Sequence, residues 1–124
     1  MGFLDGIMGN ATEVSVENLQ KEYADLLVEG EVIEKAYQLI RDMFIFTDKR
    51  LILVDKQGIS GKKTEYHSLP YKSITHFAVE TAGQFDRDAE LKIWLSGGYG
   101  VQKEFKKGTD ILGVQKTLAQ YVLG

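Results

Sequence analysis

A chain of 124 residues that is 44% hydrophobic and 27% charged has the size and composition of one globular domain with a buried core. It contains no cysteine, which excludes disulfide bonds, thiolate metal sites and cysteine nucleophiles. Its net charge is −3, so the chain is not basic enough to predict nucleic-acid binding.

Residues 1–12 are rich in glycine and carry only four apolar anchors, Phe3, Leu4, Ile7 and Met8. They lack the basic segment and the long apolar run of a signal peptide or a transmembrane helix, so we expect a cytoplasmic protein. We predict that they form a flexible arm ahead of a single domain at 13–124.

A helix is predicted at about 15–28, because Ser15 is a suitable N-cap and Gly30 a suitable stop signal. One apolar stripe recurs at helical spacing between them: Val16, Leu19, Tyr23 and Leu26 or Leu27. This stripe needs a surface to pack against, and the following strands can provide one.

The segment 31–41 fits two interpretations. Its composition favours a helix with Ile33, Tyr37 and Ile40 on one stripe, but its residues also alternate as they would in a strand. We predict a strand, because the segment runs directly into the next strand with no helix stop signal between them.

Residues 43–55 give the clearest pattern in the chain. Two runs rich in β-branched and aromatic residues flank a polar tip, which predicts an antiparallel hairpin. Thr47, Asp48 and Arg50 mark its turn, where the side chain of Asp48 can close the backbone. Both runs are apolar at consecutive positions, so both faces of the hairpin must be covered.

We expect one face of this hairpin to lie in the interior of the sheet and the other under the N-terminal helix or a neighbouring subunit. The side chains predicted to contact a second copy are Phe44, Phe46, Ile52 and Val54. The edges of a sheet that does not close fully can also pair with another chain.

Shorter alternating runs follow at 63–69, 74–81, 91–95 and 101–105. Thr109 then caps a predicted amphipathic helix at 109–123. The chain is therefore expected to be mainly β, with about seven antiparallel strands between 32 and 106 and a last helix that closes one end of the curled sheet.

Four motifs stand in order along the chain: Phe-Thr-Asp-Lys-Arg-Leu at 46–51, Leu-Pro-Tyr-Lys-Ser-Ile at 69–74, Ala-Glu-Leu-Lys-Ile-Trp at 89–94 and Phe-Lys-Lys-Gly-Thr-Asp at 105–110. With these motifs the chain resembles the bacterial pleckstrin-homology (PH) domain family from about residue 13 to 123. The resemblance implies a partly open barrel of seven antiparallel strands capped by the C-terminal helix. It also implies homo-oligomers, which can be rings, and no enzymatic activity.

Eukaryotic PH domains that bind phosphoinositides carry a basic cluster between their first two strands. The corresponding junction in this chain, residues 39–43, is tight and places Arg41 beside Asp42. This departure argues against binding of inositol phosphates.

Residues able to support chemistry are few. His67 and His76 fall in different predicted strands, and a zinc site would need further ligands. Asp86 and Asp88 lie in a loop with too few oxygen ligands for calcium. No sequence feature marks a pocket that would shift the pKa values of a carboxylate pair for acid–base catalysis. We therefore predict no catalytic residue, metal or cofactor.

Short basic patches are formed by Lys62, Lys63, Lys103, Lys106 and Lys107. A solvated surface is the favoured interpretation, followed by pairing with another subunit and then by contact with an anionic ligand. Trp94 and Phe105 suit core or interface packing better than a ligand platform.

The leading functional hypothesis is a non-enzymatic module that assembles with copies of itself, with any other protein partner unknown. The alternative is a peripheral membrane protein that binds anionic lipid headgroups through the lysine patches. An enzyme is the least favoured class.

Overall fold

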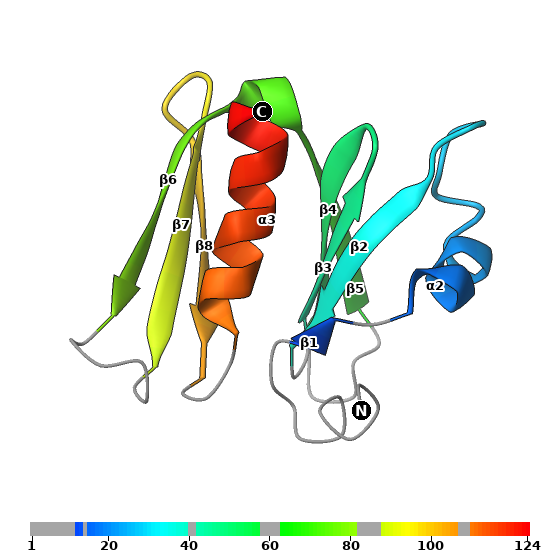
Figure 1. The fold of residues 1–124 in the computed structure, drawn as a ribbon, viewed down its shortest axis with the longest axis horizontal. Coiled ribbons are helices and arrows are strands. Elements are labelled where there is room, and N and C mark those ends of the chain that lie inside the picture. The colour runs from blue at the N-terminus through cyan, green and yellow to red at the C-terminus, as the bar shows by residue number, and fades with distance from the viewer. Residues whose placement is uncertain (1–11, 14, 40–41, 58–62, 82–87, 107–109) are drawn as a thin grey trace. The chain divides into compact units, whose positions relative to one another are not determined.

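The computed structural model describes residues 12–13, 15–39, 42–57, 63–81, 88–106 and 110–124. These residues belong to two compact units, Met1–Pro70 and Tyr71–Gly124, each of which is described by itself. In each unit one helix packs against an antiparallel sheet (Figure 1).

The sheet of the first unit has five strands in the order β1-β2-β3-β4-β5. These are β1 (Thr12–Glu13), β2 (Ile33–Gln38), β3 (Asp42–Thr47), β4 (Arg50–Gln57) and β5 (Lys63–Pro70). The segment 31–41 thus contains a strand, as predicted, and its alternating pattern rather than its helical composition decided the structure.

β3 and β4 form the predicted hairpin, joined through Asp48 and Lys49. Its register places Phe44 opposite Leu53 and the neighbouring Ile45 opposite Ile52. Because successive side chains of a strand point to opposite faces, these two pairs lie on opposite faces of the hairpin. Both pairs are buried, as the doubly apolar pattern predicted.

The N-terminal helix α2 (Val16–Glu22) covers one face of this hairpin. Leu19 of α2 belongs to a buried cluster with side chains of β2, β3 and β4: Ile33, Ala36, Ile45, Ile52 and Val54. The prediction that the N-terminal helix covers the hairpin is therefore confirmed.

α2 is shorter than the predicted helix at 15–28. Ser15 is the N-cap residue, but its side chain makes no capping hydrogen bond. Beyond the helix the backbone forms tighter turns, in which the N–H of Leu26 donates to the carbonyl of Tyr23 at 2.9 Å. In this segment the Leu26 carbonyl accepts a hydrogen bond from the distant Arg50, and the N–H of Val28 donates to the nearby Glu31 carboxylate.

The second unit begins with the short 3-10 helix η1 (Tyr71–Ser73). Its sheet has three strands in the order β6-β7-β8, with β6 (Ile74–Thr81), β7 (Ala89–Leu95) and β8 (Gly100–Phe105). The chain ends in α3 (Ile111–Leu123), which packs against η1, β6 and β7. Tyr121 of α3 stacks on Tyr71 of η1 with ring centroids 4.7 Å apart.

α3 begins at Ile111 and is capped by Asp110, whose carboxylate accepts a hydrogen bond from the N–H of Gly113 at 3.0 Å. The predicted cap, Thr109, is wrong, and that residue lies outside the described part of the chain. Leu112, although apolar, is 48% exposed. The buried face of the helix consists of Ile111, Val114, Thr117 and Leu118.

Replacing Asp110 by alanine is expected to lower the free energy of unfolding by about 1 kcal/mol, because the N–H of Gly113 loses its acceptor. Urea unfolding followed by circular dichroism measures this loss. Lys116→Ala, at an exposed position of the same helix, is the matched control and should leave stability nearly unchanged. Equal stability of the two variants would contradict a capping role for Asp110.

The fold is mainly β with a helix near each end of the described chain, as predicted. Among the described residues, β1 is an addition of two residues to the predicted set of about seven strands. No helix in the described ranges is long and apolar enough to cross a membrane. The arm predicted at 1–12 lies almost wholly outside these ranges, and the single domain at 13–124 stays a prediction.

Candidate functional site

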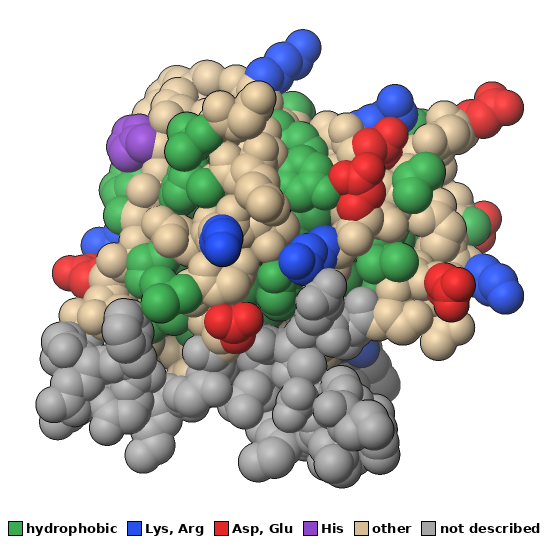
Figure 2. Space-filling view, viewed as in Figure 1, with side chains coloured by type: hydrophobic (Ala, Val, Ile, Leu, Met, Phe, Trp, Pro, Cys, Tyr) green, Lys and Arg blue, Asp and Glu red, His purple; other side chains and the backbone are tan. Residues whose placement is uncertain are grey.

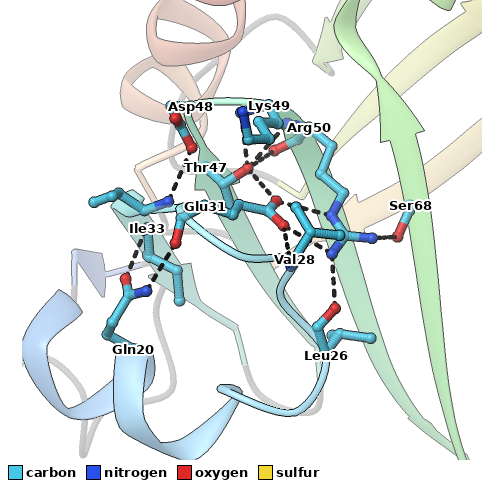
Figure 3. A network of polar contacts seen from close by, with 11 residues as sticks. Gln20, Leu26, Val28, Glu31, Ile33, Thr47, Asp48, Lys49, Arg50 and Ser68 are labelled. Carbon is cyan, nitrogen blue, oxygen red and sulfur yellow. Dashed lines mark hydrogen bonds and ion pairs between the residues drawn. The ribbon is translucent and has the colours of Figure 1, made fainter.

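The turn between β3 and β4 brings the three predicted signature residues together (Figure 3). The Thr47 hydroxyl accepts hydrogen bonds from the N–H groups of Lys49 and Arg50, at 3.0 and 2.9 Å. It donates to Glu31 Oε2 at 2.7 Å. The Asp48 carboxylate accepts from the N–H of Val32 at 2.9 Å, so the tip of the hairpin is tied to the segment before β2.

Arg50 is the hub of this network. Its Nε and Nη2 atoms donate to the two carboxylate oxygens of Glu31, at 2.9 and 3.0 Å. Nη2 also donates to the Leu26 carbonyl at 2.8 Å, and Nη1 donates to the Ser68 hydroxyl at 3.0 Å. The planar guanidinium thus joins the hairpin, the turn after α2 and strand β5 with one side chain.

Glu31 is the acceptor at the centre of the network and is only 3% exposed. Burial alone would raise the pKa of its carboxyl group. Hydrogen bonds from Arg50, Thr47 and the N–H of Val28 outweigh this effect and lower the pKa to about 2. The carboxylate therefore stays ionised at neutral pH although it is buried.

Glu31 and Gln20 were not predicted to belong to this site. The Gln20 side chain donates to the Glu31 carbonyl at 2.9 Å and accepts from the N–H of Ile33 at 2.8 Å, which joins α2 to the start of β2. One signal was available, because an arginine in an apolar hairpin requires an acidic partner. Nothing in the spacing showed that this partner stands 19 positions before Arg50.

The polar groups of the Glu31–Arg50 network are engaged with one another and with the backbone. In the described part of the chain, every buried side-chain nitrogen or oxygen has a hydrogen-bond partner. The Glu31 carboxylate already accepts from Thr47, Arg50 and Val28, whereas a general base needs an accessible lone pair. We therefore assign the signature turn a role in the stability of the fold.

The four side chains predicted to contact a second copy are buried within the chain. Phe44, Phe46, Ile52 and Val54 are each at most 2% exposed. The hairpin register also places the two phenylalanines on the opposite face from the other two. Ile52 and Val54 pack in the cluster under α2, so a surface for self-association has to be sought elsewhere.

The predicted basic patches are divided between the two units. Lys63 is exposed at the start of β5 in the first unit, whereas Lys103 and Lys106 belong to the second. Lys62 and Lys107 lie outside the described residues. On the face that Figure 2 shows, the basic side chains stand as separate points rather than as a continuous patch.

The two histidines are also separated. His67 is half-buried on β5 in the first unit, and His76 is exposed on β6 in the second. Within the described ranges, no group of three or more His, Asp or Glu side chains is arranged to hold a metal ion. Asp88 is exposed, and Asp86 lies outside these ranges.

The sheet of the second unit has an outer face on which side chains of all three strands stand in register. Exposed or half-buried residues on this face alternate with buried or half-buried ones on the other face. Three rows cross the strands: His76, Trp94 and Gly100; then Ala78, Lys92 and Gln102; then Glu80, Glu90 and Glu104.

The first row is aromatic. The rings of His76 and Trp94 stack with centroids 4.4 Å apart and planes 12° apart. A shallow groove of about 190 Å³ lies next to the indole, lined in part by Gly100 and Gln102. Trp94, for which we predicted packing in the core or at an interface, is thus half-buried on the outer face of the sheet.

The other two rows carry charge. Lys92 Nζ lies 3.0 Å from Glu80 Oε1 and 3.9 Å from Glu90 Oε1. The hydrogen bond and the charge of Glu80 raise the pKa of Lys92. The Gln102 amide donates to Glu90, and Glu104 completes the acidic row. This face is exposed to solvent, and ion pairs on such a face contribute little to the free energy of unfolding.

Strand β6 is the edge of this sheet with the fewest features that block pairing with another strand. Within its sheet β6 is hydrogen-bonded to β7 alone. Edge strands commonly avoid further pairing through lysine, proline or other charged residues. β6 has a single charged residue, Glu80. The edge strands β5 and β8 follow the rule more closely, with Lys63, Glu65 and Pro70 in β5 and Lys103 and Glu104 in β8.

Known proteins are similar to this chain over nearly its whole length. Residues 2–122 match the family model of the bacterial PH domain. The chain is 60% identical over 121 residues to the uncharacterised protein YjqA of Bacillus subtilis, covering 96% of this chain and 97% of that protein.

Two crystal structures are also similar to this chain. A pleckstrin homology domain from Shewanella amazonensis is 57% identical, with a TM-score of 0.87 over 99% of this chain and 100% of that one. A protein with a pleckstrin-homology domain from Shewanella loihica is 57% identical, with a TM-score of 0.76 over 92% and 98%. The resemblance carried by the four sequence motifs, and the PH-like fold that it implied, are thereby confirmed.

Proposed function

This chain belongs to the bacterial PH domain family, and from that premise and its edge strand β6 we propose that it is a non-enzymatic module whose copies associate with one another. The observation that carries the proposal is β6 itself, an eight-residue edge with one charged residue. The outward main-chain groups of such an edge can form hydrogen bonds with an added strand. The proposed location is the cytoplasm.

Two apolar side chains of β6 support this proposal. Phe77 and Val79 lie on the face of the strand that looks toward the core, opposite the buried Ile93 and Leu91. Both remain only half-buried, because β6 has a strand neighbour in its sheet on one side alone. A strand added to this edge would cover more of their area, at about 25 cal/mol for each Å² of apolar surface removed from water.

Two observations support a non-enzymatic function. The chain belongs to this family, and its buried polar groups bind one another and the backbone. Glu31 and Arg50 are engaged with each other and with the backbone, so they serve the fold. A shared fold alone would not settle function. The side chains of the hairpin tip bind one another and the backbone, as expected of residues that stabilise the fold.

Replacing Ala78 by lysine is expected to convert the assembly into single chains, because a lysine at an edge places a desolvated charge in any added strand pair. Light scattering coupled to size exclusion would show the mass fall from a multiple of 13.9 kDa to 13.9 kDa. Leu112→Lys adds the same charge at an exposed position of α3 and should keep the assembled mass. A wild-type protein that has the mass of one chain at micromolar concentration would end the proposal.

A further inference from the structure

A groove opens beside the only tryptophan of the chain, on the outer face of the second unit's sheet. Trp94 stands between His76 of β6 and Gly100 of β8. The imidazole stacks on one side of the indole, with ring planes 12° apart. On the other side Gly100 has no side chain, whereas a Cβ at this position would lie 3.7 Å from Trp94 Cδ1. The side of the indole toward β8 is therefore left open to a ligand.

This groove suits a flat cation. The face of an indole ring carries partial negative charge, and tryptophan is the aromatic side chain that binds cations best. The guanidinium of arginine is planar and stacks on such rings. The volume of the groove is about 190 Å³, below the roughly 300–1,000 Å³ of small-molecule pockets, so it has room for the head of one side chain.

The charge of the face also favours a cation. Among its described residues, the carboxylates of Glu80, Glu90 and Glu104 stand against a single ammonium. That ammonium belongs to Lys92 and is turned toward Glu80, with 3.0 Å between Nζ and Oε1. A second depression, of about 330 Å³, lies at the acidic row, and the exposed Asp88 is part of its lining. These charges would repel anionic partners such as nucleic acids or acidic membranes.

We propose that this outer face docks an extended basic segment of another protein, with an arginine stacked on Trp94 and a second basic side chain at the acidic row. Trp94 and Glu90 are four positions apart on β7, which corresponds to about 13 Å. An extended segment that runs along β7 spans this distance in four residues, so its two basic side chains stand at positions i and i+4. The site uses side chains of the sheet face and is separate from the main-chain groups of β6 on which the proposed function depends.

Both ends of the face are needed for a selective site. The acidic row alone would concentrate any cation near the sheet, and single charge pairs on a surface are weak. The indole adds a flat surface on which a guanidinium binds in one orientation. Between the two ends, Lys92 is paired with Glu80, and the Gln102 amide donates to Glu90. The partner's residue i+2, which lies over this middle row, is therefore expected to be uncharged.

Binding is directly measurable, because all tryptophan emission of the protein comes from Trp94. The probe is the capped peptide Ser-Arg-Ser-Ser-Ser-Arg-Ser, which contains no aromatic residue. We expect it to change the emission of Trp94 in a saturable way, and to bind less tightly as the ionic strength rises. The peptide Ser-Ser-Ser-Arg-Arg-Ser-Ser has the same composition, but its adjacent arginines point to opposite sides of an extended chain. It should bind about threefold more weakly or worse.

Variants of the protein separate the two ends of the site. Trp94→Leu keeps an apolar side chain but removes the aromatic face, and it should weaken binding of a fluorescein-labelled peptide about three- to tenfold by anisotropy. Glu104→Lys reverses a charge at an exposed position and should weaken binding about fivefold at low salt. Circular dichroism shows whether each variant is folded, and Glu104→Lys keeps the proposal testable if Trp94→Leu is not.

Glu65→Lys is the matched control, because it makes the same change of charge at an exposed position of β5 in the first unit. It should leave the affinity within about twofold of the wild type. An effect as large as that of Glu104→Lys would overturn the proposal, because binding would then follow the net charge of the protein alone.

The peptide experiments decide the remaining outcomes. A preference for the spaced arginines that is lost in Trp94→Leu and reduced in Glu104→Lys would support the proposal. No change in Trp94 emission up to about 1 mM peptide would overturn it. Equal affinity for both peptides, or for the dication putrescine, would also overturn it, because such attraction ignores spacing and shape and is only that of an acidic surface for cations.

Discussion

Replacing Arg50 by alanine is expected to lower the free energy of unfolding by about 3–5 kcal/mol, the cost of breaking a buried ion pair from one side. Glu31 is only 3% exposed, and Arg50 donates to both of its carboxylate oxygens. The Leu26 carbonyl and the Ser68 hydroxyl would lose a donor as well. Urea unfolding followed by circular dichroism would measure the loss.

Lys49→Ala is the matched control for this prediction, because Lys49 is exposed at the same hairpin tip. We expect its effect to stay within about 0.5 kcal/mol. Removing Glu31 together with Arg50 should cost less than the sum of the two single changes, since the pair is then deleted as a unit. A loss for Arg50→Ala as small as that for Lys49→Ala would mean that the network contributes little to stability.

Glu31 is also expected to make the protein lose stability in acid. Its pKa is about 2 in the folded chain against 4.5 ordinarily, because hydrogen bonds from Arg50, Thr47 and Val28 outweigh burial. The unfolded chain therefore binds a proton more readily than the folded one. This contribution is complete above about pH 4.5 and disappears as the pH falls toward 2. The difference between the two pKa values corresponds to about 3 kcal/mol.

Urea unfolding of the wild type and of Glu31→Gln between pH 7 and pH 2 would test this. The other carboxylates titrate in both proteins, so the difference between the two curves isolates Glu31. We expect this difference to be largest at neutral pH, where the wild type is more stable, and to shrink as the pH falls from about 4.5 toward 2. A difference that stays constant over this range would contradict a low pKa for Glu31.

The polar groups of the two units serve different purposes. In the first unit Glu31, Thr47 and Arg50 face inward and bind one another, so they hold the hairpin tip in place. In the second unit His76, Glu80 and other polar side chains stand on the outer face of the sheet. The proposed self-association through β6 therefore involves the second unit, and the buried network belongs to the first unit.

The burial of the four predicted oligomer contacts within the chain has a clear physical origin. The sequence showed that both strands of the hairpin are apolar on both faces, but it did not show which residues share a face. That depends on the register, which sets Phe44 opposite Leu53 and Ile45 opposite Ile52. Residues of α2 and of the turn after it then pack against Ile45, Ile52 and Val54 on one of these faces.

Local sequence patterns also failed to predict where the first helix ends and where the last helix begins. Gly30, expected to end the first helix, lies well past Glu22, the last residue of α2, and adopts φ +83° in a later turn. Beyond the end of the helix, Arg50, far along the chain, binds the Leu26 carbonyl. For the last helix, Thr109 and Asp110 are both good capping residues, and only the backbone geometry chose Asp110.

The sequence by itself determined the hairpin, the strand order along the chain, the two helices and the family, because these depend on periodicity and on short motifs whose residues are neighbours. Tertiary structure alone decided that Glu31 is the partner of Arg50, that Phe44 and Ile52 face opposite ways, and that β6 is the least protected edge. Each of these depends on contacts between residues far apart in the chain, and the free energy of such contacts is set by register and burial, which no local pattern encodes.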